Sequence, residues 1–228
     1  MARKNKLTKF AELLTFPNVV ENFDPQNTTL LLHHGVEIDL HGIWHSAFFN
    51  NNKPITLELA CGRGEYSLAL ARIFPQRNFI GVDIKGSRIW KGAKDALTEG
   101  LDNVGFLRTR IEQIDQFFSA GELEEIWITF PDPFISKENR RLTSPKFLNR
   151  YKRILAKGGQ IHLKTDDDEL YQYSIETVNQ FEGASILYSN DDIYASELYC
   201  RELEFKTYYE NLHLEQGKTI KYLRFTLG

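Results

Sequence analysis

The chain has 228 residues, of which 42% are hydrophobic, and its formal net charge at pH 7 is -3. This length and composition predict one globular domain with a sizeable core, and no apolar run approaches the roughly 20 residues that a membrane span requires. The basic N-terminus MARKNKLTKF also lacks the apolar segment of a signal peptide, so we expect a cytoplasmic protein. The two cysteines, Cys61 and Cys200, are too few for a disulfide framework or a cysteine-based zinc site, so we expect both thiols to be reduced.

Residues 1–54 precede the regular pattern of the chain and are predicted to form an N-terminal extension. This segment contains the helical stretch KLTKFAELL and the turn-rich stretch FPNVVENFDPQN. Its periodicity does not indicate a function. We expect residues 55–228 to form the main part of the single globular domain.

From residue 55 onward, strand-like and helix-like segments alternate. Helical patterns, among them EYSLALARIF, SRIWKGAKDALTE and IEQIDQFFSAG, lie between the first six strand-like segments. This alternation predicts an α/β fold with a mostly parallel sheet and helices on both faces. A helical or irregular excursion leads directly into the last strand, which we expect to be antiparallel beside the sixth. The seven predicted strands are 55–59, 78–83, 103–108, 125–130, 160–165, 184–189 and 219–225.

A glycine-containing turn follows the first of these strands, in LELACGRGEYSLALA. Gly62 and Gly64 allow a ligand to approach the backbone closely, as in dinucleotide-binding turns, but Ser67 stands where a third glycine would complete the NAD pattern. Glu58 and Glu65 would repel a pyrophosphate, whereas they suit the sulfonium and ammonium groups of S-adenosylmethionine (SAM). Alternatively, the glycines only permit a tight turn and Glu58 caps a helix.

Asp83 ends the second predicted strand, about twenty residues after the glycine turn. An acidic residue at this position accepts hydrogen bonds from ribose hydroxyls in nucleotide-binding folds. This feature is compatible with NAD and SAM alike, so the acidic turn is what favours SAM.

The stretch EIWITFPDPF places Asp132 between two prolines directly after the fourth predicted strand. Pro131 and Pro133 restrict the backbone on either side and so fix the position of the carboxylate. A plain turn could use the same residues, but the position at a strand end favours an active-site role.

Basic residues are concentrated downstream of this loop. Residues 137–157 contain eight Lys or Arg against the single acid Glu138. Such a cluster in an acidic protein suggests contact with an anion, although a solvated helix face would have the same composition. Arg140 and Arg141 belong to this cluster and follow the Asp132 loop. The N-terminus carries a second basic group, formed by Arg3, Lys4, Lys6 and Lys9.

In these stretches the sequence resembles the bacterial tRNA (guanine-N7)-methyltransferases, the TrmB-like class I SAM-dependent enzymes. The similarity covers most of residues 55–225, through LELACGRGEYSLALA, NFIGVDIKG, TFPDPF, RRLTSPKFLNRYKRILAKGGQIHLKTD and KTYYENLHLEQGKTIKYLRF. It implies a Rossmann-like fold and methyl transfer from SAM to N7 of guanosine 46, in the variable loop of tRNA.

The resemblance also implies roles for individual residues. The expected SAM contacts are Glu58, Gly62, Gly64 and Asp83, together with Asp132, which matches the family's catalytic aspartate. The expected substrate contacts are Lys137, Arg140, Arg141, Asp166, Thr207, Tyr208, Tyr209 and Glu210. Helix capping by one of residues 166–168, and burial of either tyrosine against the last strand, remain alternative interpretations.

The sequence departs from the family at a few positions. Arg110 and Ile111 replace an Asp-Ala pair that holds the adenine amine, so adenine recognition is expected to use backbone groups or Glu112. Phe134 replaces a tryptophan, and the basic loop is shorter than usual.

Several alternatives stay open at this stage. These are a class I methyltransferase with a small-molecule or protein acceptor, a non-catalytic RNA-binding protein of the same fold and, least favoured, a nicotinamide dehydrogenase. His33, His34, His41 and His45 do not complete a metal-ligand pattern, so no metal is expected. A monomer and a homodimer are equally compatible with the sequence.

Overall fold

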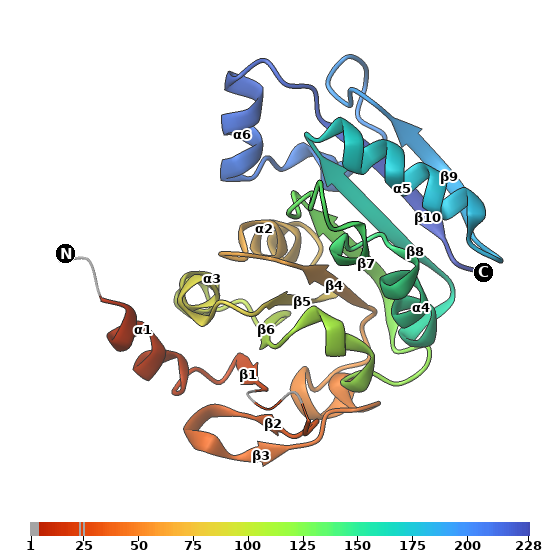
Figure 1. Ribbon diagram of the computed structural model, residues 1–228. Coiled ribbons are helices and arrows are strands. Elements are labelled where there is room, and N and C mark those ends of the chain that lie inside the picture. Colours follow the sequence, from red (N-terminus) through yellow and green to blue (C-terminus); the bar gives the residue numbers. More distant parts are fainter. Residues whose placement is uncertain (1–4, 23, 25) are drawn as a thin grey trace. The chain divides into compact units, whose positions relative to one another are not determined.

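A computed structural model of the protein describes residues 5–22, 24 and 26–228. Arg3 and Lys4 of the expected basic N-terminus lie outside the described residues. The chain forms two compact units, of which the first ends at Ser119 and the second spans Ala120–Gly228 (Figure 1).

The first unit is built around three parallel strands: β4 (Ile55–Leu59), β5 (Asn78–Asp83) and β6 (Val104–Arg108). All residues of β4 and β5 are buried, which explains why these strands are near-continuous apolar runs in the sequence. Helix α2 (Glu65–Ile73) connects β4 to β5, and α3 (Gly86–Glu99) connects β5 to β6. Parallel strands meet their ligands at their carboxyl ends, so this connectivity places the turns after β4 and β5 at the same edge of the sheet.

The N-terminal extension is part of the first unit. Its strand β1 (Val19–Glu21) pairs in parallel with β6 and antiparallel with β2 (Leu30–Leu31), which in turn pairs with β3 (Glu37–Ile38). The strand order in this unit is therefore β3-β2-β1-β6-β5-β4.

Helical segments of the extension also contact the rest of the first unit. Helix α1 (Lys6–Leu13) packs on α3, where the Trp90 indole donates a hydrogen bond to Glu12 at 2.9 Å. The short helix η2 (Trp44–Phe48) buries Trp44, whose indole donates to the Phe117 carbonyl at 2.8 Å and stacks on Phe118. A 3-10 turn, η1 (His33–Gly35), lies between β2 and β3. The extension is thus packed into this unit and does not form a separate tail within the described residues.

The second unit contains four strands in the order β7-β8-β10-β9. Strands β7 (Leu123–Thr129) and β8 (Leu155–Thr165) are parallel, whereas β10 (Lys221–Thr226) is antiparallel to both β8 and β9 (Ser185–Asn190). The helical elements are η4 (Glu138–Arg140), α4 (Pro145–Ile154), α5 (Asp168–Gln180), η5 (Arg201–Glu204) and α6 (Tyr208–Glu215).

The predicted α/β class is confirmed, and each of the seven predicted strands corresponds to one of β4–β10. The antiparallel placement of the last strand beside the sixth is also confirmed. Three further strands in the extension raise the number in the described chain to ten, because β1–β3 continue the sheet beyond β6. The helix expected in IEQIDQFFSAG is wrong, since only the 3-10 segment η3 (Ile111–Gln116) forms there. No described helix has the length and apolar character needed to cross a membrane.

Candidate cofactor and substrate sites

The glycine turn links β4 to α2 and is built from left-handed backbone conformations. Ala60, Gly62 and Gly64 have φ angles of 57°, 58° and 70°, and Gly64 is the N-cap of α2. Left-handed residues turn the chain sharply between a buried strand and a buried helix, and glycine adopts them without steric cost. The first turn of α2 thereby lies near the carboxyl end of β4, where the Ser67 amide donates a hydrogen bond to Glu58.

The two glycines meet different surroundings. A Cβ atom on Gly64 would lie 2.5 Å from the Phe106 ring, so this glycine lets α2 pack against β6. A Cβ atom on Gly62 would meet nothing within 4 Å. The backbone at Gly62 therefore borders open space, as a position that a ligand approaches closely would require.

Two buried carboxylates hold the turn. Asp83 accepts a hydrogen bond from the Gly62 amide at 3.0 Å and a second from the Lys85 amide at 2.7 Å. Glu58 accepts hydrogen bonds from the amide and the hydroxyl of Ser67, at 2.9 and 2.5 Å. The Ser67 amide lies in the first turn of α2, so the alternative that Glu58 caps a helix is confirmed. Capping leaves the negative charge of Glu58 at the turn.

The pKa of the Cys61 thiol is sensitive to the charges around this turn. Burial raises the pKa of Cys61 well above its ordinary value, and the negative charges of Glu58 and Asp83 raise it further. Burial disfavours a cation as well as a thiolate, but the negative charges of Glu58 and Asp83 act oppositely on the two and favour a cation. The turn is therefore suited to a sulfonium or ammonium group and unsuited to a pyrophosphate.

Arg110, where the family has an acidic residue, is exposed and is the N-cap of η3. Glu112 follows in the first turn of η3 and is also exposed. Adenine recognition through Glu112 or through the backbone here stays a prediction.

In the second unit, β7 leads into the loop that carries Asp132. The two phenylalanines that flank Pro131-Asp132-Pro133 both have left-handed backbones, with φ of 47° at Phe130 and 45° at Phe134. Positive φ is unusual for a bulky residue, and strained positions of this kind concentrate at functional sites. The Asp132 side chain is exposed. It forms no hydrogen bond or ion pair with the described residues and is accessible to a ligand.

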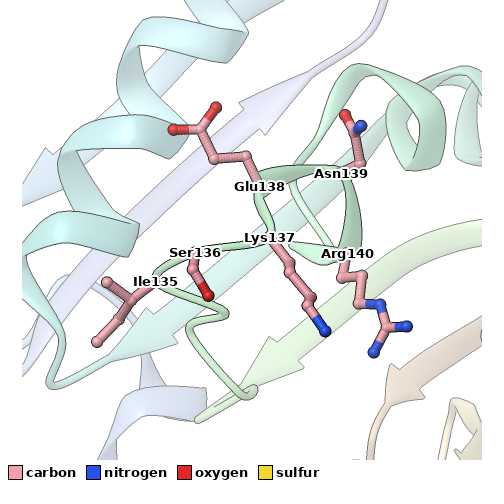
Figure 2. A pocket seen from close by; sticks show the side chains of 6 residues that line it. All are labelled: Ile135, Ser136, Lys137, Glu138, Asn139 and Arg140. Carbon is pink, nitrogen blue, oxygen red and sulfur yellow. The ribbon is translucent and has the colours of Figure 1, made fainter.

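The basic loop after Asp132 borders a pocket of about 570 Å³ lined by Ile135, Ser136, Lys137, Glu138, Asn139 and Arg140. Figure 2 shows the side chains of Lys137 and Arg140 extending to the same side of the loop, while Glu138 points to the opposite side. The two cations are exposed and face a common space, so an anionic group could contact both.

Arg141 has a different environment from Arg140. Its side chain is 1% exposed, its Nε atom donates to the Pro133 carbonyl at 2.9 Å and its guanidinium pairs with Glu169. The guanidinium also lies 4.4 Å from the centroid of the Tyr173 ring. The expectation that Arg141 contacts RNA does not fit this placement, because the side chain is enclosed by the protein and satisfied internally.

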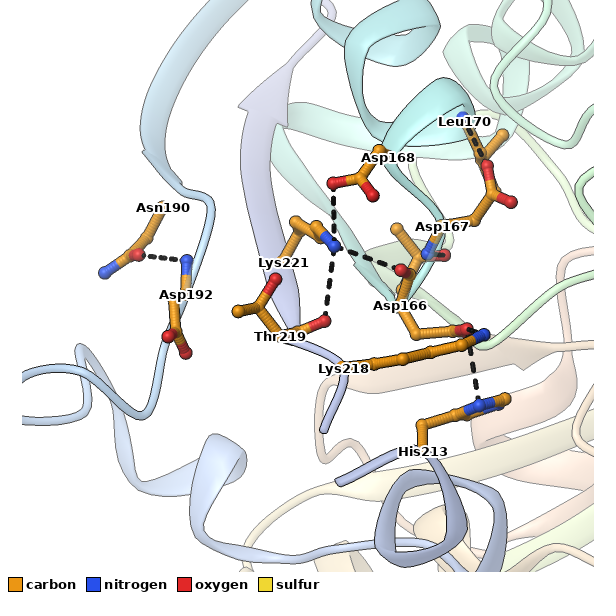
Figure 3. A network of polar contacts seen from close by, with 11 residues as sticks. Asp166, Asp167, Asp168, Leu170, Asn190, Asp192, His213, Lys218, Thr219 and Lys221 are labelled. Atoms are coloured by element: carbon orange, nitrogen blue, oxygen red, sulfur yellow. Dashed lines mark hydrogen bonds and ion pairs between the residues drawn. The ribbon is translucent and has the colours of Figure 1, made fainter. Parts of the chain in front are cut away.

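Asp166 lies at the carboxyl end of β8 within a network of basic side chains (Figure 3). Its Oδ2 atom is 2.5 Å from Lys218 Nζ and 3.3 Å from His213 Nδ1, and its backbone carbonyl accepts from Lys221 at 3.0 Å. The His213 ring in turn stacks on Phe130, with 5.9 Å between centroids. The expected substrate aspartate is thus connected, through His213, to the start of the Asp132 loop.

The next two acids, Asp167 and Asp168, stabilise the start of helix α5. Asp167 is the N-cap and accepts from the Leu170 amide at 2.7 Å, as the capping interpretation expected for one member of the acidic run. Asp168 pairs with Lys221 at 2.8 Å.

Of the expected substrate residues 207–210, Thr207 and Glu210 are buried, whereas the two tyrosines between them are exposed. Thr207 and Glu210 form a capping box at the start of α6, and the buried Glu210 carboxylate lies 2.7 Å from Lys164 Nζ. Tyr208 and Tyr209 are instead 60% and 54% exposed, which excludes their burial against the last strand in this structure. Their rings form an edge-to-face pair with 5.6 Å between centroids.

Sequence reasoning missed Lys164, His213 and Lys218. Lys164 stands in an apolar strand pattern, and a lysine in such a position signals a buried partner, here Glu210. No local pattern singles out His213 and Lys218, because they reach Asp166 only through the long-range placement of α6 and β10. Within the described part of the chain, no group of three or more His, Cys, Asp or Glu residues could hold a metal ion.

Comparisons with known proteins agree with this geometry. A family model described as putative methyltransferase matches residues 52–223. The tRNA (guanine-N(7)-)-methyltransferase of Bacteroides fragilis is 46% identical over 98% of this chain and 86% of its own length. The enzyme of the same name from Christiangramia forsetii is 47% identical over the full length of both chains.

Solved structures show the same fold at low sequence identity. The 16S rRNA methyltransferase KamB has a TM-score of 0.57 and 16% identity, covering 77% of this chain and 88% of its own. The aminoglycoside resistance methyltransferase NpmB1 has a TM-score of 0.55 and 16% identity, covering 79% and 90%. These likenesses confirm the Rossmann-like methyltransferase fold, and the sequence relatives are more specific. The chain belongs to the tRNA (guanine-N7)-methyltransferase family.

Proposed function

We propose that this protein transfers a methyl group from SAM to N7 of a guanosine in tRNA, at position 46 of the variable loop. The observation that carries the proposal is the acidic glycine turn of the first unit, combined with the exposed, conformationally fixed Asp132 of the second. The names of the relatives support the choice of tRNA as acceptor. Such a substrate is consistent with a cytoplasmic location.

The first unit would bind the cofactor. Asp83 can accept hydrogen bonds from ribose hydroxyls while it continues to hold the Gly62 amide, since a carboxylate has several acceptor positions. The open space at Gly62 lets the cofactor approach the backbone, and Glu58 contributes negative potential from beneath the turn. When bound, SAM supplies an electrophilic methyl group on a sulfonium centre.

The second unit would recognise the nucleoside. Guanine N7 has an in-plane lone pair, so no base has to remove a proton before the attack, and alignment supplies most of the acceleration. The methylated ring carries a positive charge, which the Asp132 carboxylate can stabilise as it develops. Asp166 can accept from the guanine N1-H and the exocyclic amine through the oxygen that Lys218 does not occupy.

Different side chains would contact the phosphates and the bases of the RNA. Lys137 and Arg140 face one pocket and can hold a phosphate, whereas the exposed Tyr208 and Tyr209 rings offer stacking surfaces for an unpaired base. Thr207 and Glu210 would set the position of these tyrosines through the capping box of α6. No metal is required for this chemistry, and either a monomer or a homodimer could perform it.

The test is methyl transfer from labelled SAM to unmodified tRNA, with the product nucleoside identified by mass spectrometry. We expect N7-methylguanosine, and its loss in a tRNA with adenosine in place of guanosine 46. Transfer to the altered tRNA would move the target to another guanosine. Measurable SAM binding without transfer would oppose the proposal and indicate another acceptor or a non-catalytic RNA-binding protein.

A further inference from the structure

Arg141 is buried beside the loop that carries Asp132, and its enclosed side chain is not available for contact with RNA. Burying a guanidinium is costly unless its charge and its donors are satisfied. Here the donors meet the Pro133 carbonyl and the Glu169 carboxylate, and the face of the group lies over Tyr173. Glu138 is a more distant acid, at 4.0 Å.

These partners come from two different elements. Pro133 is the residue after Asp132, whereas Glu169 and Tyr173 lie on successive turns of α5. Arg141 therefore ties the middle of the Asp132 loop to a helix that is anchored on β8–β10. The ends of the loop are held separately, by the Phe130 amide donating to the Lys164 carbonyl at 2.8 Å and the Lys137 amide donating to the Phe134 carbonyl at 2.9 Å.

The backbone of the loop explains why a central tie is needed. Phe130 and Phe134 both adopt the left-handed region, which is unfavourable for residues with a Cβ atom. A strained conformation persists only where the surroundings determine it. Without the hydrogen bond to the Pro133 carbonyl, the segment between the two phenylalanines would be free to relax to other backbone angles, and Asp132 would move with it.

We propose that Arg141 is a positioning residue for methyl transfer, which holds the Pro131-Asp132-Pro133 segment in the geometry that places the Asp132 carboxylate. It acts through Pro133 and does not touch the substrate. The inference rests on the proposed function, because it assigns to Asp132 a role in the methyl-transfer step.

The main variants are Arg141→Ala and Arg141→Lys, assayed by single-turnover methyl transfer at saturating SAM and tRNA. Misplacement of a catalytic group by about 1 Å can cost on the order of 100-fold in rate, and we expect a loss of this size for Arg141→Ala with a much smaller change in KM for tRNA. Lysine can donate one hydrogen bond to Pro133 but cannot bridge two partners in a fixed fork, so Arg141→Lys should recover only part of the rate.

Two further measurements separate positioning from loss of folding. Hydrogen exchange of residues 130–137 should become faster in Arg141→Ala, with exchange in β8 and β10 unchanged. Added guanidinium ion at millimolar concentration should restore part of the rate to Arg141→Ala, because it can occupy the vacated space between Pro133 and Glu169. The matched control is Arg72→Ala, which removes an exposed arginine that also pairs with a glutamate, Glu99, at 2.7 Å and should leave the rate unchanged.

Three results would overturn the inference. One is an Arg141→Ala protein that matches Arg72→Ala in rate. Another is a change confined to KM for tRNA, which would make Arg141 an RNA contact. The last is a loss of rate that only follows the loss of folded protein, with no rescue by guanidinium and no local change in exchange. Absence of methyl transfer by the unmodified protein would instead count against the proposed function.

Discussion

The Glu210 carboxylate and the Lys164 ammonium group lie 2.7 Å apart, and neither side chain is exposed to solvent. The Tyr194 hydroxyl donates to the same carboxylate at 2.6 Å, and Lys164 donates to the Phe205 carbonyl at 3.2 Å. This pair joins the carboxyl end of β8 to the first turn of α6. Two residues that the sequence presents as a strand lysine and a substrate-binding glutamate therefore form an internal connection within the second unit.

Removing one partner of this pair is expected to destabilise the protein. Glu210→Ala leaves the Lys164 charge buried without a counterion, which typically costs about 3 to 5 kcal/mol of unfolding free energy. Urea unfolding of this variant should be compared with that of Glu215→Ala, which alters an exposed glutamate on the same helix. Equal stability of the two variants would show that the pair contributes little.

The same pair predicts a dependence of stability on alkaline pH. Burial lowers the pKa of Lys164 from its ordinary value of 10.5, and Glu210 raises it only in part. The unfolded chain then binds more protons than the folded chain between the two pKa values, so the contribution of Lys164 to the unfolding free energy increases as the pH rises toward 10.5. Unfolding midpoints of the unmodified protein and of Lys164→Met, measured over this range, should differ in slope; parallel curves would contradict the prediction.

Asp132→Asn should separate catalysis from cofactor binding. The amide keeps the size of the side chain but cannot stabilise the developing positive charge, so we expect the rate of methyl transfer to fall by on the order of 100-fold or more. SAM affinity, measured by calorimetry, should change only slightly. Equal losses of rate and affinity would assign Asp132 mainly to cofactor binding.

Lys137 and Arg140 are expected to contact phosphate. The double variant Lys137→Ala/Arg140→Ala should weaken tRNA binding and reduce the slope of log affinity against log salt concentration by about one to two. The matched control is Lys152→Ala/Arg153→Ala, which removes two exposed basic residues of α4 within the same basic window. A slope that falls equally in both double variants would indicate that the whole window, and not this pocket, contacts RNA.

The two glycines of the turn are expected to have different roles, Gly64 in stability and Gly62 in SAM binding. Gly64→Ala should lower stability strongly, because its Cβ atom would lie 2.5 Å from Phe106. Gly62→Ala meets no protein atom and should cost only about 1 to 2 kcal/mol for its left-handed backbone, yet it should weaken SAM binding by filling the open space. Thermal unfolding and SAM titration of both variants test this; unchanged SAM affinity in Gly62→Ala would place the cofactor elsewhere.

The order of the main elements could be predicted from the sequence because buried parallel strands and amphipathic helices have different periods. Asn78–Asp83 was bounded correctly, since a turn precedes it and Asp83 ends it. The strands of the extension were not found, because β2 and β3 contain two residues each and a periodicity cannot be read over that length. Their existence depends on β1 pairing with β6, which is a long-range contact.

The candidate site was predictable where function imposes a local pattern. Gly62, Gly64 and Asp83 lie where the turn chemistry indicated, and Asp132 is exposed at a strand end. Arg141 could not be distinguished from Arg140, because adjacent basic residues look alike until the loop folds and one of them points inward. The sequence likewise does not show which of residues 207–210 face solvent, because this depends on the capping box that forms when α6 folds.

The pairing of β1 with β6 has a consequence for any shortened form of this protein. A chain that began at the first strand of the glycine-turn motif would leave the backbone donors and acceptors along one side of β6 unsatisfied, and it would uncover the apolar residues now beneath Trp44. Open strand edges of this kind pair readily with other chains and promote aggregation. Strands β1–β3 thus protect the edge of β6, and solubility during expression should depend on them even where the chemistry does not.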